Sequence, residues 1–191
     1  MSPDETAWGL QALTAGERRL LLWLARESIR TALEGEALPK LNAPTPALEE
    51  MTGVFVSLHQ GTRLRGCVGT VVAERSLHEN VVHLARSAAF DDPRFPPLSL
   101  TELADITIEV SRLSRLVRAW PGDVRPGQHG VCIQHGTQRA VFLPQVATTY
   151  QWDRDTLLSQ LCCKAQLPSD TWRRPDATLM VFVAEVFGEE R

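Results

Sequence analysis

Apolar and polar residues alternate along Val54–Leu58 and again along Leu64–Val72, with the period of two that is typical of a half-buried β-strand. Gln60-Gly61 lies between the two segments and predicts the turn of a hairpin. A second pair of segments repeats this pattern around His135-Gly136-Thr137, namely Val131–Gln134 and Arg139–Leu143. We therefore expect two antiparallel hairpins.

Helix starts are marked by three Ser/Thr-x-x-Glu capping boxes, which are Thr14–Glu17, Ser76–Glu79 and Ser99–Glu102. The first helix is expected to run to about Leu33, where Gly35 ends it. The third box predicts only a short helix. Asp153 predicts the start of a further helix, which is expected to end around residues 162–165.

Two more apolar patterns predict strands. Ile106, Ile108 and Val110 alternate with polar residues, which indicates a half-buried strand. The segment Thr178–Phe187 is nearly all apolar and is expected to be a central strand buried on both faces. Helices and strands are mixed without strict βαβ alternation. We therefore expect an α+β fold with a mainly antiparallel sheet flanked by helices.

Composition excludes several classes of protein. The chain has 191 residues, which is the usual length of one domain. Its net charge of -3 gives it no basic surface of the kind that binds nucleic acid. It contains neither a membrane-length apolar run nor a signal-like start. The four cysteines form no CxxC pair, which favours a reducing cytoplasm. The sequence predicts no metal site and no cofactor.

The strongest candidate for chemistry is Leu64–Thr70, which places the thiol of Cys67 between Gly66 and Gly69. In a regular strand Arg63 and Arg65 would share a face with Cys67, and two guanidiniums near a thiol favour the nucleophilic thiolate. The glycines would leave room for a ligand, or they could mark a bulge that shifts this parity by one residue. The alternative is that Cys67 is simply a small buried apolar residue.

Three prolines make the loop Phe90–Pro97 stiff. Asp91 and Asp92 follow a predicted helix end, where the helix dipole disfavours negative charge. They are expected either to have compensating partners or to face water. The candidate partners are Arg65, Arg86 and Arg94.

Two further residues could act as an acid or a base. Glu109 lies on the polar face of its predicted strand, and His129 lies in a loop rich in glycine and proline. A glutamate in such a position is more often only solvated. A loop histidine is usually only surface, although neighbouring glycines allow close approach to a ligand.

Taken together, five stretches resemble the AMMECR-type domain family, whose bacterial members are called AmmeMemoRadiSam system protein A. These stretches are Leu64–Thr70, Ala89–Leu98, Ile108–Ser111, Phe142–Ala147 and Leu161–Ala165 with Leu167-Pro168. The resemblance covers about residues 14–189. It implies an α+β fold of two unequal lobes, with both termini in the larger lobe, a smaller lobe over roughly residues 112–150, and a cleft between the lobes. Residues 1–13 are expected to be poorly ordered.

The resemblance also implies partners and site residues, although no particular reaction. The partners would be a Memo-like protein and a radical S-adenosylmethionine enzyme. The motif positions carried over to this chain are Arg65, Gly66, Cys67, Gly69, Asp92, Arg94, Glu109, His129 and Gln145. Gln166 and Thr148-Thr149-Tyr150 depart from the family pattern, which usually has a helix-ending glycine at the first position and a glutamate in the second segment.

Two functions fit these observations. In the first, the chain is an enzyme or an enzyme-system component with Cys67 as the nucleophile. Arg65 would favour the thiolate or bind an anionic substrate, and Glu109 or His129 would be the acid or base. Asp92 and Arg94 would shape the cleft wall. In the second, the cleft is a non-catalytic binding or regulatory site for a small molecule or a protein, and Cys67 only contacts the ligand.

Overall fold

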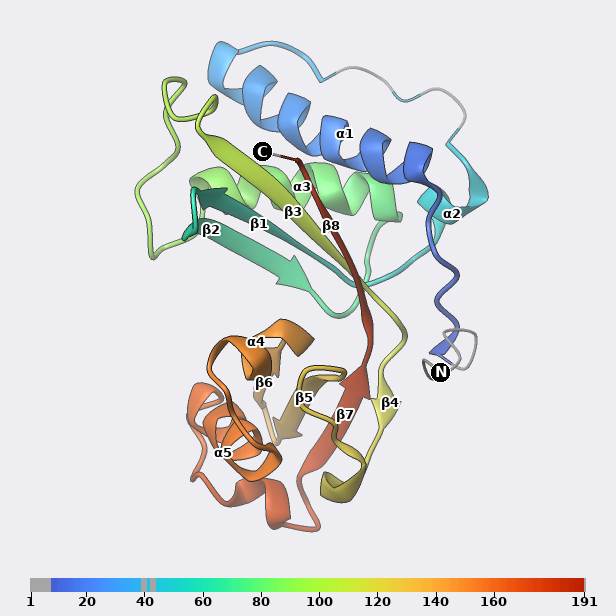
Figure 1. The fold of residues 1–191 in the computed structure, drawn as a ribbon, viewed down its shortest axis with the longest axis vertical. Helices are drawn as coiled ribbons and strands as arrows, with labels where there is room; N and C mark the ends of the chain where they lie inside the picture. The colour runs from blue at the N-terminus through green and yellow to red at the C-terminus, as the bar shows by residue number, and fades with distance from the viewer. Residues whose placement is uncertain (1–7, 39–40, 42–43, 191) are drawn as a thin grey trace. The chain divides into compact units, whose positions relative to one another are not determined.

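The structure is a computed structural model that describes residues 8–38, 41 and 44–190. It divides into two compact units, which are described separately. The large unit contains the described residues of 11–113 and 185–190, and the small unit contains residues 8–10 and 114–184. Both have an antiparallel sheet with helices packed on it (Figure 1), so the expected α+β fold is confirmed.

The large unit is a four-stranded sheet with two long helices on one face (Figure 1). The strand order is β2-β1-β3-β8. Its elements are α1 (Ala15–Glu34), α2 (Pro46–Glu49), β1 (Val54–Gln60), β2 (Arg63–Thr70), α3 (Leu77–Phe90), β3 (Ile106–Leu113) and β8 (Ala184–Gly188). Its core joins α1 and α3 to alternate residues of the strands, such as Val54, Val56 and Leu58.

The small unit is built around a second four-stranded sheet, in the order β4-β7-β5-β6. Its elements are β4 (Val117–Arg118), the 3-10 helix η2 (Pro121–Asp123), β5 (Gly130–His135), β6 (Gln138–Phe142), α4 (Pro144–Thr149), α5 (Arg154–Lys164), the 3-10 helix η3 (Thr171–Arg173) and β7 (Thr178–Phe182). Leu157, Leu158 and Leu161 of α5 pack on Val131 and Ile133 of β5 in a core of its own.

Local signals in the sequence predicted most of these elements correctly. The Thr14 and Ser76 capping boxes begin α1 and α3, and Gly35 ends α1 in the left-handed conformation. Both hairpins form as β1–β2 and β5–β6. Asp153 accepts a hydrogen bond from the Thr156 amide and begins α5.

The short helix expected after Ser99 is wrong, because this segment forms turns. The side-chain contact of the capping box does form, since the Ser99 amide donates to Glu102 Oε2 at 3.0 Å. Only three residues separate Glu102 from the start of β3, too few to propagate a helix. The chain instead makes bonds between residues three apart, such as the Glu102 amide to the Ser99 carbonyl at 3.2 Å.

The single central strand expected over Thr178–Phe187 is also wrong. The chain leaves the ladder at Val183 and forms two strands, β7 and β8, in different sheets. Ser114 replaces the missing ladder partner, because its amide donates to the Val183 carbonyl at 2.9 Å and its hydroxyl accepts from the Val183 amide at 3.0 Å. β8 is an edge strand, and Val186 is exposed.

The unit boundaries differ from the expected lobes. The smaller lobe was expected over about residues 112–150, but the small unit extends to residue 184 because β7 pairs with both β4 and β5. Residues 1–7 lie outside the described residues. Residues 8–13 were also expected to be poorly ordered, but Leu10 and Leu13 are buried. In the described part of the chain, no helix has the length and apolar character needed to cross a membrane.

Candidate functional site

Cys67 lies in a row of polar side chains across the sheet of the large unit. The strand register places Ser57 of β1 opposite Cys67 of β2 and also opposite Glu109 of β3. Directly opposite residues point to the same face of a sheet. This face is the one away from α1 and α3, because the neighbours of Ser57 in β1 lie in the core with those helices. Ser57 Oγ donates a hydrogen bond to Cys67 Sγ at 3.3 Å.

A β-bulge changes the expected position of the arginines. The register shifts between Leu58 and His59, so that Leu58 pairs with Gly66, His59 pairs with Leu64, and Arg65 is the extra residue. This one-residue slip reverses the parity of the strand beyond the bulge. The shared face of Arg63, Arg65 and Cys67, which was expected for a regular strand, therefore does not form. The alternative, a bulge that shifts the parity by one residue, is present.

The Arg65 side chain instead contacts the segment that precedes β3. Its Nε donates to Glu102 Oε1 at 2.8 Å, and its guanidinium lies 5.9 Å from the centre of the Phe95 ring. This guanidinium holds the pKa of Glu102 at about 2. Arg65 is buried, and among the described residues its Nη1 has no hydrogen-bond partner. Its contacts tie the bulge to the loop between α3 and β3.

The two glycines of the motif do not leave open space beside the thiol. A Cβ at Gly66 would lie 2.1 Å from the Ala88 carbonyl oxygen of α3. A Cβ at Gly69 would lie 2.2 Å from the ring of Phe55, its cross-strand partner. Gly66 therefore permits close packing of β2 on α3, and Gly69 is covered by an aromatic ring. The expectation that these positions leave room for a ligand is wrong, because the chain itself fills them.

Asp92 and Arg94 hold the backbone of Cys67. Asp92 Oδ2 accepts from the Cys67 amide at 2.9 Å, and Arg94 Nη2 donates to the Cys67 carbonyl at 3.1 Å. Arg94 also donates to Asp92, with Nε 2.9 Å from Oδ1 and Nη2 2.7 Å from Oδ2. β2 is an edge strand, so these side chains satisfy backbone groups that no neighbouring strand pairs. Of the three candidate arginine partners for Asp92, the structure selects Arg94.

Replacing Asp92 with asparagine is expected to lower the free energy of unfolding at about pH 7 by about 2 kcal/mol. The Arg94 guanidinium, as the largest cause, lowers the pKa of the buried Asp92 to about 2 from 3.8. A lowered folded-state pKa stabilises the protein above the unfolded value, and this contribution is lost as the pH falls through the folded value. Urea unfolding at several pH values measures it.

The difference between wild type and Asp92→Asn is therefore expected to be largest above about pH 4 and to shrink toward about pH 2. Asp91→Asn is the matched control, because Asp91 is the exposed neighbour in the same loop. A pH-independent difference, or an equal effect of Asp91→Asn, would contradict this assignment.

Glu109 and His59 line a shallow hollow of about 300 Å³. Its walls come from the turn after β1, the start of β3 and the end of β8, through Gly61, Thr62, Thr107, Ile108, Gly188 and Glu189. His59 Nε2 is buried there and has no hydrogen-bond partner within the described part of the chain. Sequence reasoning missed Ser57 and His59. Their two-residue spacing in β1 put them on one face, but only the register with β2 and β3 placed that face beside Cys67 and Glu109.

The remaining motif residues, His129 and Gln145, belong to the small unit, whereas Cys67 and Glu109 belong to the large one. His129 is buried, and its ring lies 5.2 Å from that of Trp8 in an edge-to-face contact. Burial lowers the pKa of His129, and the nearby Arg125 cation lowers it further. Gln145 is half-buried at the start of α4.

Gln166 takes over the geometry of the helix-ending glycine that the family usually has there. Its φ is 59°, in the left-handed region, and the Leu167 amide donates to the Cys162 carbonyl at 2.9 Å as in a helix end closed by glycine. The helix end is therefore closed in the usual way although glutamine replaces the glycine. The other departure, Thr148-Thr149-Tyr150, is exposed and comprises the last two residues of α4 and the residue that follows the helix.

The cysteines differ in access. Cys67 is half-buried, Cys132 and Cys162 are buried, and Cys163 is exposed. Burial raises the pKa of the Cys162 thiol. Across the described ranges, no three His, Cys, Asp or Glu side chains gather closely enough to hold a metal ion.

Comparisons with known proteins agree with this architecture. The AMMECR1 family model matches residues 22–187. Protein MK0488 of Methanopyrus kandleri is 39% identical over 94% of this chain and 92% of its own length. A protein of Thermococcus onnurineus is 37% identical over 89% of each chain. The crystal structure of the uncharacterized protein PH0010 from Pyrococcus horikoshii superposes with a TM-score of 0.85 and 34% identity, and covers 90% of each chain. These matches span nearly all of both units, and the chain belongs to the AMMECR1 family.

Proposed function

We propose that this chain is an enzyme, or a component of an enzyme system, in which the Cys67 thiolate is the nucleophile and Glu109 is the acid or base. The observation that carries the proposal is the row of Cys67, Ser57 and Glu109 across three strands, with Ser57 Oγ donating to the sulfur. A nucleophile, a hydroxyl and a carboxylate on one sheet face are a set that acyl- or group-transfer chemistry can use.

The spacing of the strands restricts how these groups can work together. Neighbouring strands are about 4.8 Å apart, so Glu109 stands roughly 10 Å from Cys67. This distance is too long for direct proton transfer, which needs about 3 Å. In the proposed step, Cys67 Sγ forms a bond to an electrophilic carbon of the substrate and the leaving group departs. The thiol proton passes to the Ser57 oxygen as this hydroxyl turns to give its own proton toward Glu109. The proton then returns from Glu109 through Ser57 to the leaving group as its bond to the carbon breaks.

The hollow beside Glu109 supplies a place for the rest of the substrate in this proposal. His59 lines it with a buried ring nitrogen that has no hydrogen-bond partner among the described residues. A buried polar atom without a partner costs free energy, which a bound ligand group would recover. The substrate would then extend from the thiol to His59. The partners implied by the family resemblance, a Memo-like protein and a radical S-adenosylmethionine enzyme, would supply or consume it.

Alkylation with iodoacetamide tests the nucleophile. At about pH 7 we expect Cys67 to react about tenfold faster than the exposed Cys163. Cys67 is less exposed, but a thiolate that the site activates reacts faster than an ordinary thiol even when the reagent reaches it less easily. Mass spectrometry separates the two cysteines within one sample, so Cys163 is an internal reference. Ser57→Ala is expected to slow only Cys67, and a metabolite mixture is expected to protect only Cys67. Cys67 reacting more slowly than Cys163, with no effect of Ser57→Ala, would rule out the nucleophile.

The second candidate is a non-catalytic binding or regulatory module. The contacts of Asp92 and Arg94 favour it, because both charged side chains hold the Cys67 backbone and are thereby used for structure. In this case Cys67 only contacts the ligand. Protection of a slowly reacting Cys67 by the metabolite mixture would support this candidate over the enzyme.

A further inference from the structure

The small unit has a hollow of its own, of about 430 Å³, around the loop that carries His129. Residues from β4, η2, β7 and the first described segment of the chain line it. They are Trp8, Val117, Arg118, Ala119, Gly122, Asp123, Arg125, His129 and Val181. The proposed role of Cys67 uses none of them.

Two arginine side chains at this hollow have no polar partner in the described part of the chain. Within the residues that the structure describes, neither Arg118 nor Arg125 forms a side-chain hydrogen bond or an ion pair, whereas Arg139, Arg154, Arg173 and Arg174 of the same unit all make polar side-chain contacts. The one carboxylate in the lining, Asp123, accepts from the Trp120 amide at 2.9 Å and so is partly used by the backbone. The lining therefore has an excess of positive charge, which favours an anion.

His129 adds a neutral donor to the same hollow. Its Nδ1 accepts a hydrogen bond from the Arg125 amide at 3.3 Å, which places the proton of the neutral ring on Nε2. No described residue accepts from Nε2. Because burial lowers the pKa of His129, the ring stays neutral at physiological pH and keeps this single donor.

The remaining lining is apolar. Trp8 is half-buried and contacts the His129 ring edge-to-face, with centres 5.2 Å apart. Val117, Ala119 and Val181 complete this side of the hollow. A concave site with an apolar wall and a few converging polar groups is the usual form of a small-molecule site.

We infer that this hollow binds a small organic anion, whose carboxylate or phosphate group is held by Arg118 and Arg125 and whose apolar body lies against Trp8. The histidine Nε2 donates to the same ligand. This assigns His129 to ligand binding in the small unit, a role separate from the chemistry proposed for Cys67. It also gives a function to Arg118, which would otherwise be only a solvated surface residue.

The test uses phenyl phosphate and benzoate as probes on the full chain, with benzyl alcohol as the neutral match. Titration followed by ¹H–¹⁵N NMR is expected to shift the Trp8 indole and Gly122 amide signals with both anions and not with benzyl alcohol. Removing both cations in Arg118→Gln/Arg125→Gln is expected to weaken binding at least about tenfold, the effect of losing charged hydrogen bonds. The tighter of the two anions identifies the favoured group.

Arg154→Gln is the matched control, because Arg154 is an exposed arginine of the same unit outside the hollow. It is expected to leave both affinities unchanged within about twofold. Equal binding of benzyl alcohol, an equal loss in Arg154→Gln, or signal shifts confined to other residues would overturn the inference. Unchanged amide spectra of the variants without ligand establish that each one is folded.

Discussion

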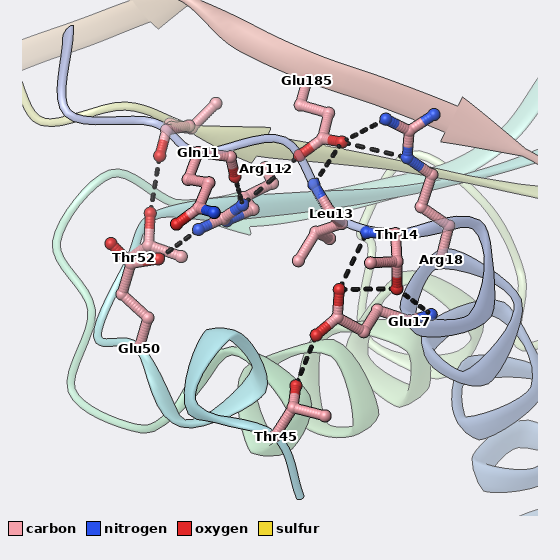
Figure 2. Close-up of polar contacts among 11 residues, drawn as sticks. Gln11, Leu13, Thr14, Glu17, Arg18, Thr45, Glu50, Thr52, Arg112 and Glu185 are labelled. Carbon is pink, nitrogen blue, oxygen red and sulfur yellow. Dashed lines mark hydrogen bonds and ion pairs between the residues drawn. The ribbon is translucent and has the colours of Figure 1, made fainter. Parts of the chain in front are cut away.

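Arg112→Ala is expected to lower the free energy of unfolding by about 3–5 kcal/mol, the usual cost of breaking a buried ion pair. Arg112 is 1% exposed at the end of β3 and connects three other segments of the large unit (Figure 2). Its Nη1 donates to the Gln11 carbonyl at 2.8 Å and to Glu185 Oε2 at 3.3 Å, and its Nη2 contacts Glu50. Alanine would leave a cavity and remove every one of these contacts. Urea unfolding measures the loss.

Arg18→Ala is the matched control for Arg112. Arg18 contacts the same carboxylate, Glu185, at 2.7 Å, but its side chain is 40% exposed (Figure 2). Exposed ion pairs contribute little because water solvates the separated charges, so we expect a loss below about 1 kcal/mol. Similar losses in the two variants would contradict the view that burial makes Arg112 important.

Gly66→Ala is expected to destabilise the large unit by about 3 kcal/mol or more, at the upper end of the cost of overpacking. The added Cβ would lie 2.1 Å from the Ala88 carbonyl oxygen, which is part of the α3 backbone and cannot rotate away as a side chain could. Either β2 or α3 must therefore shift. Because Gly66 precedes Cys67, we also expect the alkylation rate of Cys67 to change.

Gly122→Ala controls for the loss of glycine flexibility. No atom lies within 4 Å of a Cβ built at Gly122, and its φ is not in the left-handed region. A stability change within about 0.5 kcal/mol is therefore expected. A Gly66→Ala variant as stable as Gly122→Ala would show that β2 and α3 can separate at no cost, and would remove the packing reason for glycine at this position.

The elements that sequence reasoning predicted correctly are those whose signals are local. A capping box needs only contacts between residues three apart, such as Thr14 with Glu17. A hairpin needs a short turn with a residue that tolerates positive φ, as Gly61 and Gly136 do at 61° and 60°. These contacts are nearly independent of the rest of the chain, so the pattern of residues is sufficient to predict them.

The features that were predicted wrongly depend on contacts between segments that are distant in the sequence. The break at Val183 depends on Ser114, and the filled space at Gly66 depends on Ala88. The position of Arg65 depends on a bulge in the pairing of β2 with β1 and on a carboxylate of the following segment, Glu102. The apolar content of a segment and the alternation of its apolar and polar residues do not specify contacts with distant segments.

For the candidate site, the residues alone were enough to predict the family resemblance, the strand that contains Cys67 and the stiff loop that contains Asp92. How these parts combine became visible only in the folded chain. In the structure, Ser57 lies between Cys67 and Glu109, and Asp92 accepts a hydrogen bond from the Cys67 amide. His129 belongs to the other unit. The physical reason is that strand register and edge-strand pairing are set by the packing of whole strands and helices, which no short stretch of residues specifies.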